Sequence, residues 1–326
     1  MSGPPPAMSV IVVADAGGDP VRPLLGHLRR QTIHDRLELV LVAWNGASAW
    51  AGEDLSGFPA VRTLTGRTFR SIGEARAAAI GAATAPAVVL AETHSFPEPR
   101  WAEALLRRLD EGGDGVGPIV RNQNPGTAAS WAALLVGFGD WLDDRRAGAA
   151  SSLPWHSSAY RRDLLLSRGE ALPDLLEVEW LLQQAMREEG RRFWIEPEAR
   201  TRHVNVSRLR ALPQVEFVSG RLFAGLVARA RGLSPARRAA LAVSRPIAFV
   251  PRLLRILRRL PSHPDARRRM AAVVSITAAG VAAHLIGEAV GYLAGAGPAE
   301  RRRVDVECRR MRFVRPEDRR AWEGEG

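Results

Sequence analysis

The sequence has no lysine, one cysteine and few aromatic residues. Cys308 has no second cysteine to pair with, which excludes an internal disulfide and suits a reducing compartment. The chain also lacks a Gly-x-Ser-x-Gly elbow, the glycine-rich signatures of dinucleotide and P-loop phosphate binding, and Cys/His zinc spacing. A serine hydrolase, a dehydrogenase and a P-loop nucleotide hydrolase therefore find no support in the sequence.

Acidic residues are scarce in the last third of the chain. Residues 1–205 contain 22 arginines and 25 acids, whereas residues 206–326 contain 24 arginines and 10 acids, so the net charge of +11 comes from the second part. A basic region beside a nearly neutral one predicts an anionic partner. Long apolar runs and few aromatic residues in this region favour an anionic membrane surface over nucleic acid.

The first two thirds alternate apolar strands with helices. Residues 8–13, 37–44 and 85–92 read as buried strands, and a helix is expected over 71–84. This alternation predicts an α/β fold with a mainly parallel sheet flanked by helices. Ligands of such sheets bind beyond the carboxyl ends of the strands, so Asp15, Asn45 and Glu92 are expected to line one crevice. Residues 1–8, with three consecutive prolines and no charged start, predict a disordered leader and no secretory signal.

Five segments, in this order, resemble the family 2 glycosyltransferases: SVIVVADAGGDPVRPLLGHLRRQT, GEARAAAIGAATAPAVVLAE, PEPRW, SSAYRRDLLLSRG and LLEVEWLLQQAMREEGRRFWIEPEARTRH. The resemblance implies a GT-A-like, Rossmann-like fold over residues 9–207, followed by a basic helical membrane-associated region over 208–326. It also implies transfer of a sugar from a nucleoside diphosphate sugar to a lipid-linked or cell-envelope glycan, with inversion. Some bacterial members have a late segment similar to HLIGEAVGYLAG (284–295).

The family's metal-binding pair of aspartates is replaced here. Glu92 and His94 stand at those positions, and His203 matches the family's late histidine. Glu92 and His94 are two residues apart in an extended turn, so both side chains can reach one ion. A carboxylate with an imidazole suits Mn²⁺ better than Mg²⁺, which prefers oxygen ligands. The alternative is a surface turn whose metal site has been lost.

The nucleotide-contacting acids that the family often has after its second strand are also replaced. Trp44 and Asn45 stand there, so Asn45 can hydrogen-bond a ribose or uracil edge and Trp44 can stack on it. Asp15 after the first strand, Arg76 in GEARAAAIG and Glu92 complete the predicted nucleotide-sugar site. Alternatively, Trp44 is a core residue and Asn45 only forms a turn.

Glu179 lies where the resemblance puts the catalytic base, with Glu177 as the second candidate. A carboxylate there can accept the proton of the acceptor hydroxyl. Acids at a helix start are also favoured by the helix dipole alone. Trp155 and His156 are expected on the acceptor side, where an aromatic ring suits stacking on a sugar.

Two segments of the basic region are candidates for membrane contact. Around Pro251, one helical face carries Val250, Leu253, Leu254 and Leu257, opposite Arg252, Arg255 and Arg259, which is typical of an interfacial helix. The alternative is a helix docked on the catalytic domain with its arginines in water. Residues 271–299 are apolar but interrupted by Glu288, which His284 can pair, and they predict a helical hairpin in or on the membrane, with a single transmembrane span as the alternative.

These features predict a protein at the cytoplasmic face of the plasma membrane. Two alternatives remain. One is a catalytically inactive glycosyltransferase-like scaffold, which the substituted motifs keep open. The other is a basic membrane-binding module whose α/β domain is incidental.

Overall fold

The computed structural model describes residues 5–143 and 145–323. The chain forms two compact units. The first, here called the sheet unit, contains the chain up to Arg121 and residues Trp141–His203. The second, the helical unit, contains Asn122–Asp140 and Val204–Ala321.

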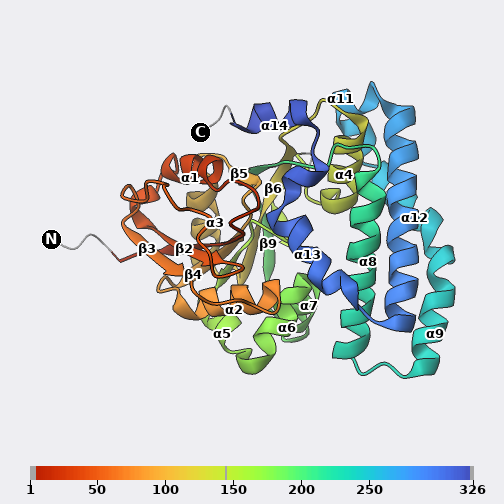
Figure 1. The fold of residues 1–326 in the computed structure, drawn as a ribbon, viewed down its shortest axis with the longest axis horizontal. Helices are drawn as coiled ribbons and strands as arrows, with labels where there is room; N and C mark the ends of the chain where they lie inside the picture. Colours follow the sequence, from red (N-terminus) through yellow and green to blue (C-terminus); the bar gives the residue numbers. More distant parts are fainter. Residues whose placement is uncertain (1–4, 144, 324–326) are drawn as a thin grey trace. The chain divides into compact units, whose positions relative to one another are not determined.

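The sheet unit is built on a nine-stranded sheet with the order β3-β2-β1-β4-β8-β6-β9-β5, and β7 pairs with β9 (Figure 1). The strands are β1 (Met8–Ala14), β2 (Leu37–Ala43), β3 (Ala60–Leu64), β4 (Ala87–Ala91), β5 (Ser95–Pro97), β6 (Gly115–Asn122), β7 (Gly148–Ala150), β8 (Ala159–Arg161) and β9 (Phe193–His203). The predicted strands correspond to β1, β2 and β4.

Only the first half of this sheet is parallel. β3, β2, β1 and β4 run in one direction, whereas β8 pairs antiparallel with β4 and β6, and β9 pairs antiparallel with β5 and β7. The sheet is therefore mixed rather than mainly parallel. The reason lies in the connections, because β5 follows β4 and β8 follows β7 without an intervening helix, so neither short strand is the second strand of a parallel βαβ unit.

Helices cover both faces of the parallel half. Alternate residues of β1 and β2, such as Val10, Val12 and Leu39, form one buried cluster with α1 and α3, while α2 packs against the same strands from the other side. This alternation is the period-two pattern of a strand buried on both faces. The helices of this unit are α1 (Arg22–Arg29), α2 (Ile72–Ala82), α3 (Trp101–Asp110), α5 (Arg162–Leu166), α6 (Leu172–Glu177) and α7 (Glu179–Glu188).

The helical unit is organised around one long helix, α12, which packs along α8 and also against α4, α9 and α10. Its main helices are α4 (Ala128–Phe138), α8 (Ala211–Ala230), α9 (Pro235–Ser244), α10 (Phe249–Leu257), α11 (Pro264–Arg267), α12 (Met270–Ala294), α13 (Pro298–Cys308) and α14 (Pro316–Glu323), with single turns η3 (Arg245–Ala248) and η5 (Arg310–Phe313).

The hairpin predicted over 271–299 is wrong. These residues continue as the single helix α12 as far as Ala294, and Glu288 lies inside it instead of turning the chain. The physical reason is that Glu288 is buried and has ionic partners, so it does not interrupt the helix. The predicted pairing with His284 is confirmed, at 3.2 Å between His284 Nε2 and Glu288 Oε1. By length and composition, α12 alone among the described helices could cross a membrane, although core helices meet the same criterion.

Glycines allow α8 and α12 to approach each other closely. A methyl group added to Gly287 would collide with the carbonyl oxygen of Phe217 and lie 2.9 Å from the backbone nitrogen of Arg221. A methyl on Gly220 would collide in the same way with the carbonyl oxygen of His284. Backbone atoms cannot move aside as a flexible side chain can, so these glycines set the distance between the helices.

Gly287→Ala should therefore destabilise the helical unit by about 1–3 kcal/mol through overpacking. The matched control is Gly137→Ala on α4, where an added methyl meets nothing within 4 Å. That change should raise stability by about 0.5–1 kcal/mol, because alanine is the better helix former. Denaturant unfolding measures both. Equal effects of the two substitutions would contradict the packing of α8 on α12.

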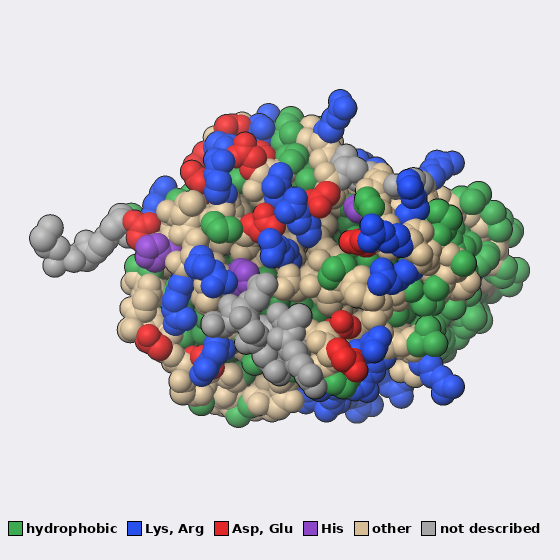
Figure 2. Space-filling view, turned by 90° about the horizontal axis from the view of Figure 1, so that it is seen from above, with side chains coloured by type: hydrophobic (Ala, Val, Ile, Leu, Met, Phe, Trp, Pro, Cys, Tyr) green, Lys and Arg blue, Asp and Glu red, His purple; other side chains and the backbone are tan. Residues whose placement is uncertain are grey.

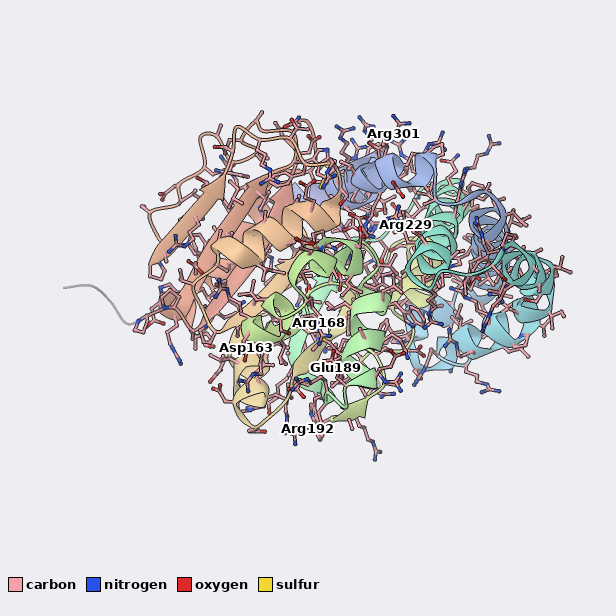
Figure 3. The ribbon with its side chains drawn as sticks, turned by 90° about the horizontal axis from the view of Figure 1, so that it is seen from below. Asp163, Arg168, Glu189, Arg192, Arg229 and Arg301 are labelled. Atoms are coloured by element: carbon pink, nitrogen blue, oxygen red, sulfur yellow. The ribbon has the colours of Figure 1, made fainter. Side chains whose placement is uncertain are left out.

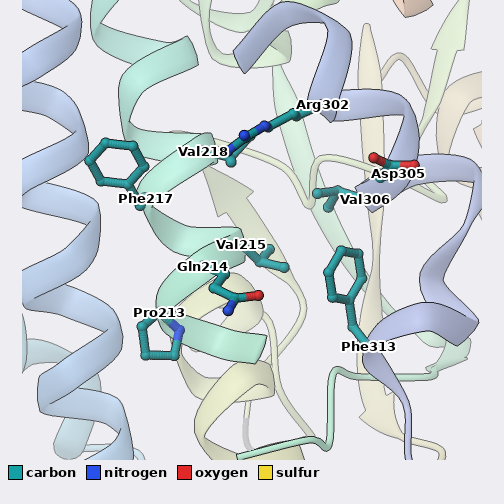
Figure 4. Close-up of a pocket in the computed structure, with 9 residues that line it drawn as sticks. All are labelled: Pro213, Gln214, Val215, Phe217, Val218, Arg302, Asp305, Val306 and Phe313. Atoms are coloured by element: carbon teal, nitrogen blue, oxygen red, sulfur yellow. The ribbon is translucent and has the colours of Figure 1, made fainter. Parts of the chain in front are cut away.

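A pocket of about 420 Å³ opens in the helical unit between α8, α13 and η5 (Figure 4). Its lining is mainly apolar, with Phe217 and Phe313 among the residues that border it. Its one acid, Asp305, is already paired with Arg309 and Arg312. The described residues that line this pocket include no cluster of carboxylates and histidines.

Candidate active site

Glu92 is the centre of a buried cluster at the carboxyl edge of the sheet. It follows β4 directly, and β4 lies beside β1, whose carboxyl end is followed by Asp15. Parallel strands bring their carboxyl ends to the same edge, which is where such folds bind ligands. Glu92 and Asp15 are both buried there.

The pairing of β5 with β9 brings two histidines together. His94 immediately precedes β5, and the first residue of β5, Ser95, is the register partner of His203 at the end of β9. The two imidazole ring centroids are consequently 5.0 Å apart, edge to face. Residues about a hundred positions apart in the sequence thus become neighbours through one short antiparallel ladder.

Three histidines surround the Glu92 carboxylate. The Glu92 Oε1 atom lies 3.3 Å from His94 Nε2 and 3.2 Å from His156 Nε2, and Oε2 lies 3.5 Å from His203 Nε2. Neither oxygen accepts a hydrogen bond from the described part of the chain, although both are buried. A buried carboxylate without hydrogen bonds is costly unless a cation balances it.

These residues fit a divalent metal ion. Glu92, His94 and His203 each offer one donor atom, and the three donors lie within 4.8 Å of one another. Metal–ligand bonds of about 2.1 Å put neighbouring donors of an octahedron about 3 Å apart, close to the separations of 3.3 and 3.5 Å measured here. The buried, unsatisfied oxygens of Glu92 are the second sign of such a site.

His156 connects Glu92 with Glu179 through Arg76. Arg76 donates from Nη1 to Glu179 Oε1 at 3.1 Å, and its Nη2 lies 3.0 Å from His156 Nδ1. A guanidinium only donates, so His156 Nδ1 accepts, and the proton of the neutral ring is then on Nε2, facing Glu92. A protonated Nε2 has no lone pair for a metal ion, so in this arrangement His156 lies beside the metal cluster and is not a fourth ligand.

Glu179 is the first residue of α7, where the helix dipole favours a negative charge. The other end of α7 is tied down by Glu189, which accepts from Arg168 Nη2 at 2.6 Å (Figure 3). Burial, and secondly the charge of Glu179, raise the pKa of Tyr160, so this neighbouring phenol stays protonated. Between Glu179 and Tyr160, Glu179 is therefore the better candidate for accepting a proton from the acceptor.

The other predicted residues have different surroundings. Glu177 is buried and accepts a hydrogen bond from Gly73 N at 2.5 Å, at the start of α2. Asn45 is exposed and closes a turn by accepting from Ala47 N at 3.2 Å. Trp44 and Trp155 are half-buried. In the described part of the chain, the Asn45 side chain therefore acts as a turn former through its hydrogen bond with Ala47 N.

Two residues that the sequence analysis missed also lie at the cluster. Asp19 is buried, with its Oδ2 atom 3.7 Å from His94 Nδ1. The sequence feature that could have indicated Asp19 is its position in the same Gly- and Asp-rich loop as Asp15. Ser157 has a φ of 64°, which makes it the one non-glycine residue in the left-handed region among those described. Its backbone nitrogen donates to Leu90 O at 2.8 Å, which fixes the adjacent His156 against the end of β4.

The sheet, its helices and the cluster at the carboxyl edge define a GT-A-like fold, as predicted. No protein-family model and no curated protein matches the sequence. Among solved structures, the chain is similar to the mannosyltransferase PcManGT from Pyrobaculum calidifontis in complex with GDP-Man and Mn²⁺, with a TM-score of 0.58 and 17% identity over 89% of this chain and 87% of that one. This likeness confirms the fold.

Two further structures match at a lower level. GalNAc-T7 with UDP, GalNAc and Mn²⁺ has a TM-score of 0.47 and 14% identity, covering 61% of this chain and 44% of that one. Residues 1–349 of S. aureus TarS in complex with UDP have a TM-score of 0.47 and 13% identity, covering 83% of this chain and 89% of that one. Both scores are too low to establish a shared fold independently.

Proposed function

We propose that this protein is a metal-dependent glycosyltransferase that moves a sugar from a nucleoside diphosphate sugar to an acceptor hydroxyl. The observation that carries the proposal is the buried Glu92 carboxylate, without hydrogen bonds and facing His94 and His203 at the carboxyl edge of the sheet. The similar mannosyltransferase structure holds GDP-Man and Mn²⁺, which suggests the same class of donor and ion here.

Glu92, His94 and His203 are the residues that would hold the ion. When bound, it supplies positive charge to the diphosphate leaving group. Two imidazoles among three donors favour Mn²⁺ over Mg²⁺. His156 Nε2 lies 3.2 Å from Glu92 Oε1, beside these ligands, while Asp15, Asn45 and Trp44 lie on the loops that would meet the nucleotide.

Glu179 accepts the proton of the acceptor hydroxyl in this proposal. Arg76 keeps Glu179 ionised and fixes the Oε1 atom, so the carboxylate is in its basic form before the acceptor arrives. A base on the acceptor side with direct displacement at the sugar carbon gives inversion. Trp155 and His156 stand in the loop before β8 and would border the acceptor.

The proposal also includes a family, an acceptor class and a location for this protein. The ordered motifs favour a bacterial family 2 enzyme with its catalytic domain over residues 9–207 and a membrane-associated region over 208–326. A lipid-linked or cell-envelope glycan is the acceptor class that fits such a region. The cytoplasmic face of the plasma membrane is then the expected location, which suits a chain whose single cysteine, Cys308, is unpaired and buried.

The test is a thermal-shift panel of nucleoside diphosphate sugars with UDP or GDP as nucleotide, each with and without Mn²⁺. A ligand at about 100 times its dissociation constant stabilises the folded state by about 2.7 kcal/mol, which the assay resolves. We expect stabilisation by one nucleotide class, dependent on Mn²⁺ and lost with a chelator. Absence of any nucleotide-dependent shift would overturn the proposal.

A catalytically inactive glycosyltransferase-like binding protein is the second candidate. One observation favours it: the ion pair of Glu179 with Arg76 makes this carboxylate a weaker base. Such a protein would show the Mn²⁺-dependent nucleotide shift but no transfer of sugar to any lipid-linked acceptor. Product analysis with the stabilising donor separates the two.

A further inference from the structure

A row of large apolar side chains on the helical unit is left exposed by the described part of the chain. Val243, Ile247, Val250 and Leu254 follow one another along α9, η3 and α10 at spacings of four, three and four residues, which puts them on one helical face. Their exposed fractions are 79%, 79%, 58% and 54%. Single exposed apolar residues are ordinary, but a row of four is a mark of a binding surface. We call these four residues the apolar stripe.

The space-filling view also shows exposed apolar side chains on the helical unit (Figure 2). Hydrophobic side chains gather at the end of the helical unit where α9 and α12 lie, and arginine side chains border them (Figure 2). Ile286 and Leu293 of α12 are also more than half exposed. Apart from Glu288 and His284, α12 carries no acidic or basic side chain.

The opposite side of the same segment is fixed to α12. Arg245 and Arg252, seven residues apart, donate to the two oxygens of Glu288 at 2.7 and 2.9 Å. Burial by itself would raise the pKa of Glu288, but the hydrogen bond from His284 and the two arginines lower it to about 2. Glu288 is therefore ionised at neutral pH. The segment cannot roll its apolar stripe inward without breaking both ion pairs to the buried Glu288.

This arrangement differs from the face predicted from the sequence. Val250 and Leu254 are outward as predicted, but Leu253 and Leu257 are half-buried, and Arg252 points to Glu288 rather than to solvent. The outward face instead extends backwards through η3 to Ile247 and Val243. The contact of Arg252 with Glu288, thirty-six residues later, decides which face is outside.

The charge around the apolar stripe distinguishes between possible partners. Residues 217–287 contain 13 arginines and one acid, Asp265. Two copies of the chain joined along the apolar stripe would bring these arginines against one another, which is unfavourable. An anionic lipid surface accepts both the apolar side chains and the positive charge.

We propose that the apolar stripe docks on an anionic lipid bilayer, with α9, η3 and α10 lying in the plane of the interface. This specifies the membrane partner of the proposed function. It is tested separately from that function, because vesicle binding needs neither a sugar nucleotide nor a metal ion.

The experiment is co-sedimentation of the full chain with phosphatidylcholine vesicles, with and without phosphatidylglycerol. The wild type should bind the anionic vesicles, and more weakly as salt is raised. Ile247→Glu combined with Val250→Glu should lower binding at least about tenfold, because two carboxylates replace apolar side chains at an anionic surface. The matched control is Leu209→Glu, which changes a leucine that is 68% exposed outside the apolar stripe.

Each outcome is decisive. Reduced binding of the double variant, together with full binding of the control and an unchanged circular dichroism melting curve, supports the proposal. If the charged variant melts early, Ile247→Ser with Val250→Ser repeats the comparison with a milder change. The proposal is overturned if the wild type ignores anionic vesicles or if all variants bind equally. It is also overturned if the apolar stripe instead mediates a dimer in lipid-free buffer, seen by light scattering.

Discussion

Glu92→Gln should weaken Mn²⁺-dependent binding of a nucleoside diphosphate by about 100-fold or more. Glu92 is the carboxylate that contacts His94, His156 and His203 together. Glutamine keeps the shape but removes the charge, and its amide nitrogen is not a metal ligand. Loss of partners outside the coordination sphere already costs about 10–100-fold in metal affinity, so loss of the carboxylate itself should cost at least as much.

Isothermal titration with Mn²⁺ and the nucleotide that the panel selects measures this loss. His94→Ala should also weaken binding, and the double variant should lose little more than Glu92→Gln, because both residues act on one ion. Glu103→Gln, a partly exposed glutamate on α3, is the matched control and should bind as the wild type does. Undiminished Mn²⁺-dependent binding by Glu92→Gln would show that the ion is held elsewhere.

Glu179→Gln should lower kcat by about 100- to 10,000-fold while leaving the affinity for the nucleotide nearly unchanged. The glutamine preserves the contact with Arg76 through its carbonyl oxygen, but it cannot accept a proton from the acceptor. Binding and turnover are thus separated by a change of one functional group.

The control for this prediction is two residues away. Glu177→Gln weakens the hydrogen bond to Gly73 N at the start of α2 and should affect stability more than kcat. Steady-state kinetics and thermal unfolding of both variants give the comparison. A large loss of kcat in Glu177→Gln with little change in Glu179→Gln would contradict the prediction and assign the role of catalytic base to Glu177.

Local patterns in the sequence predict the parallel part of the sheet and the edge at which the cluster lies. The apolar runs of β1 and β4 are each followed directly by an acid, Asp15 and Glu92, and parallel pairing aligns those ends. Asp15 and Glu92 could therefore be placed together before any coordinates. The short strands β5, β7 and β8 have no such pattern, because three residues carry no measurable period.

Local patterns do not predict the contacts that complete the cluster, and His203 was placed with Glu92 and His94 only through the resemblance. Ser95 pairs with His203, and Arg76 reaches Glu179, across about a hundred residues, and nothing local specifies either pairing. At Glu288 the local pattern gave a wrong prediction because its ionic partners lie elsewhere in the sequence. Its charge inside an apolar run predicted a break in the helix, whereas its ion pairs with Arg245 and Arg252 keep it buried in a continuous one.

The most direct test of the metal site is anomalous diffraction at the manganese edge from crystals grown with Mn²⁺ and the selected nucleoside diphosphate. The predicted result is one strong peak within bonding distance of Glu92 and at least one of His94 and His203, with the diphosphate beside it. A nucleotide bound at the sheet edge without a peak at Glu92, or a peak confined to another part of the chain, would contradict the account.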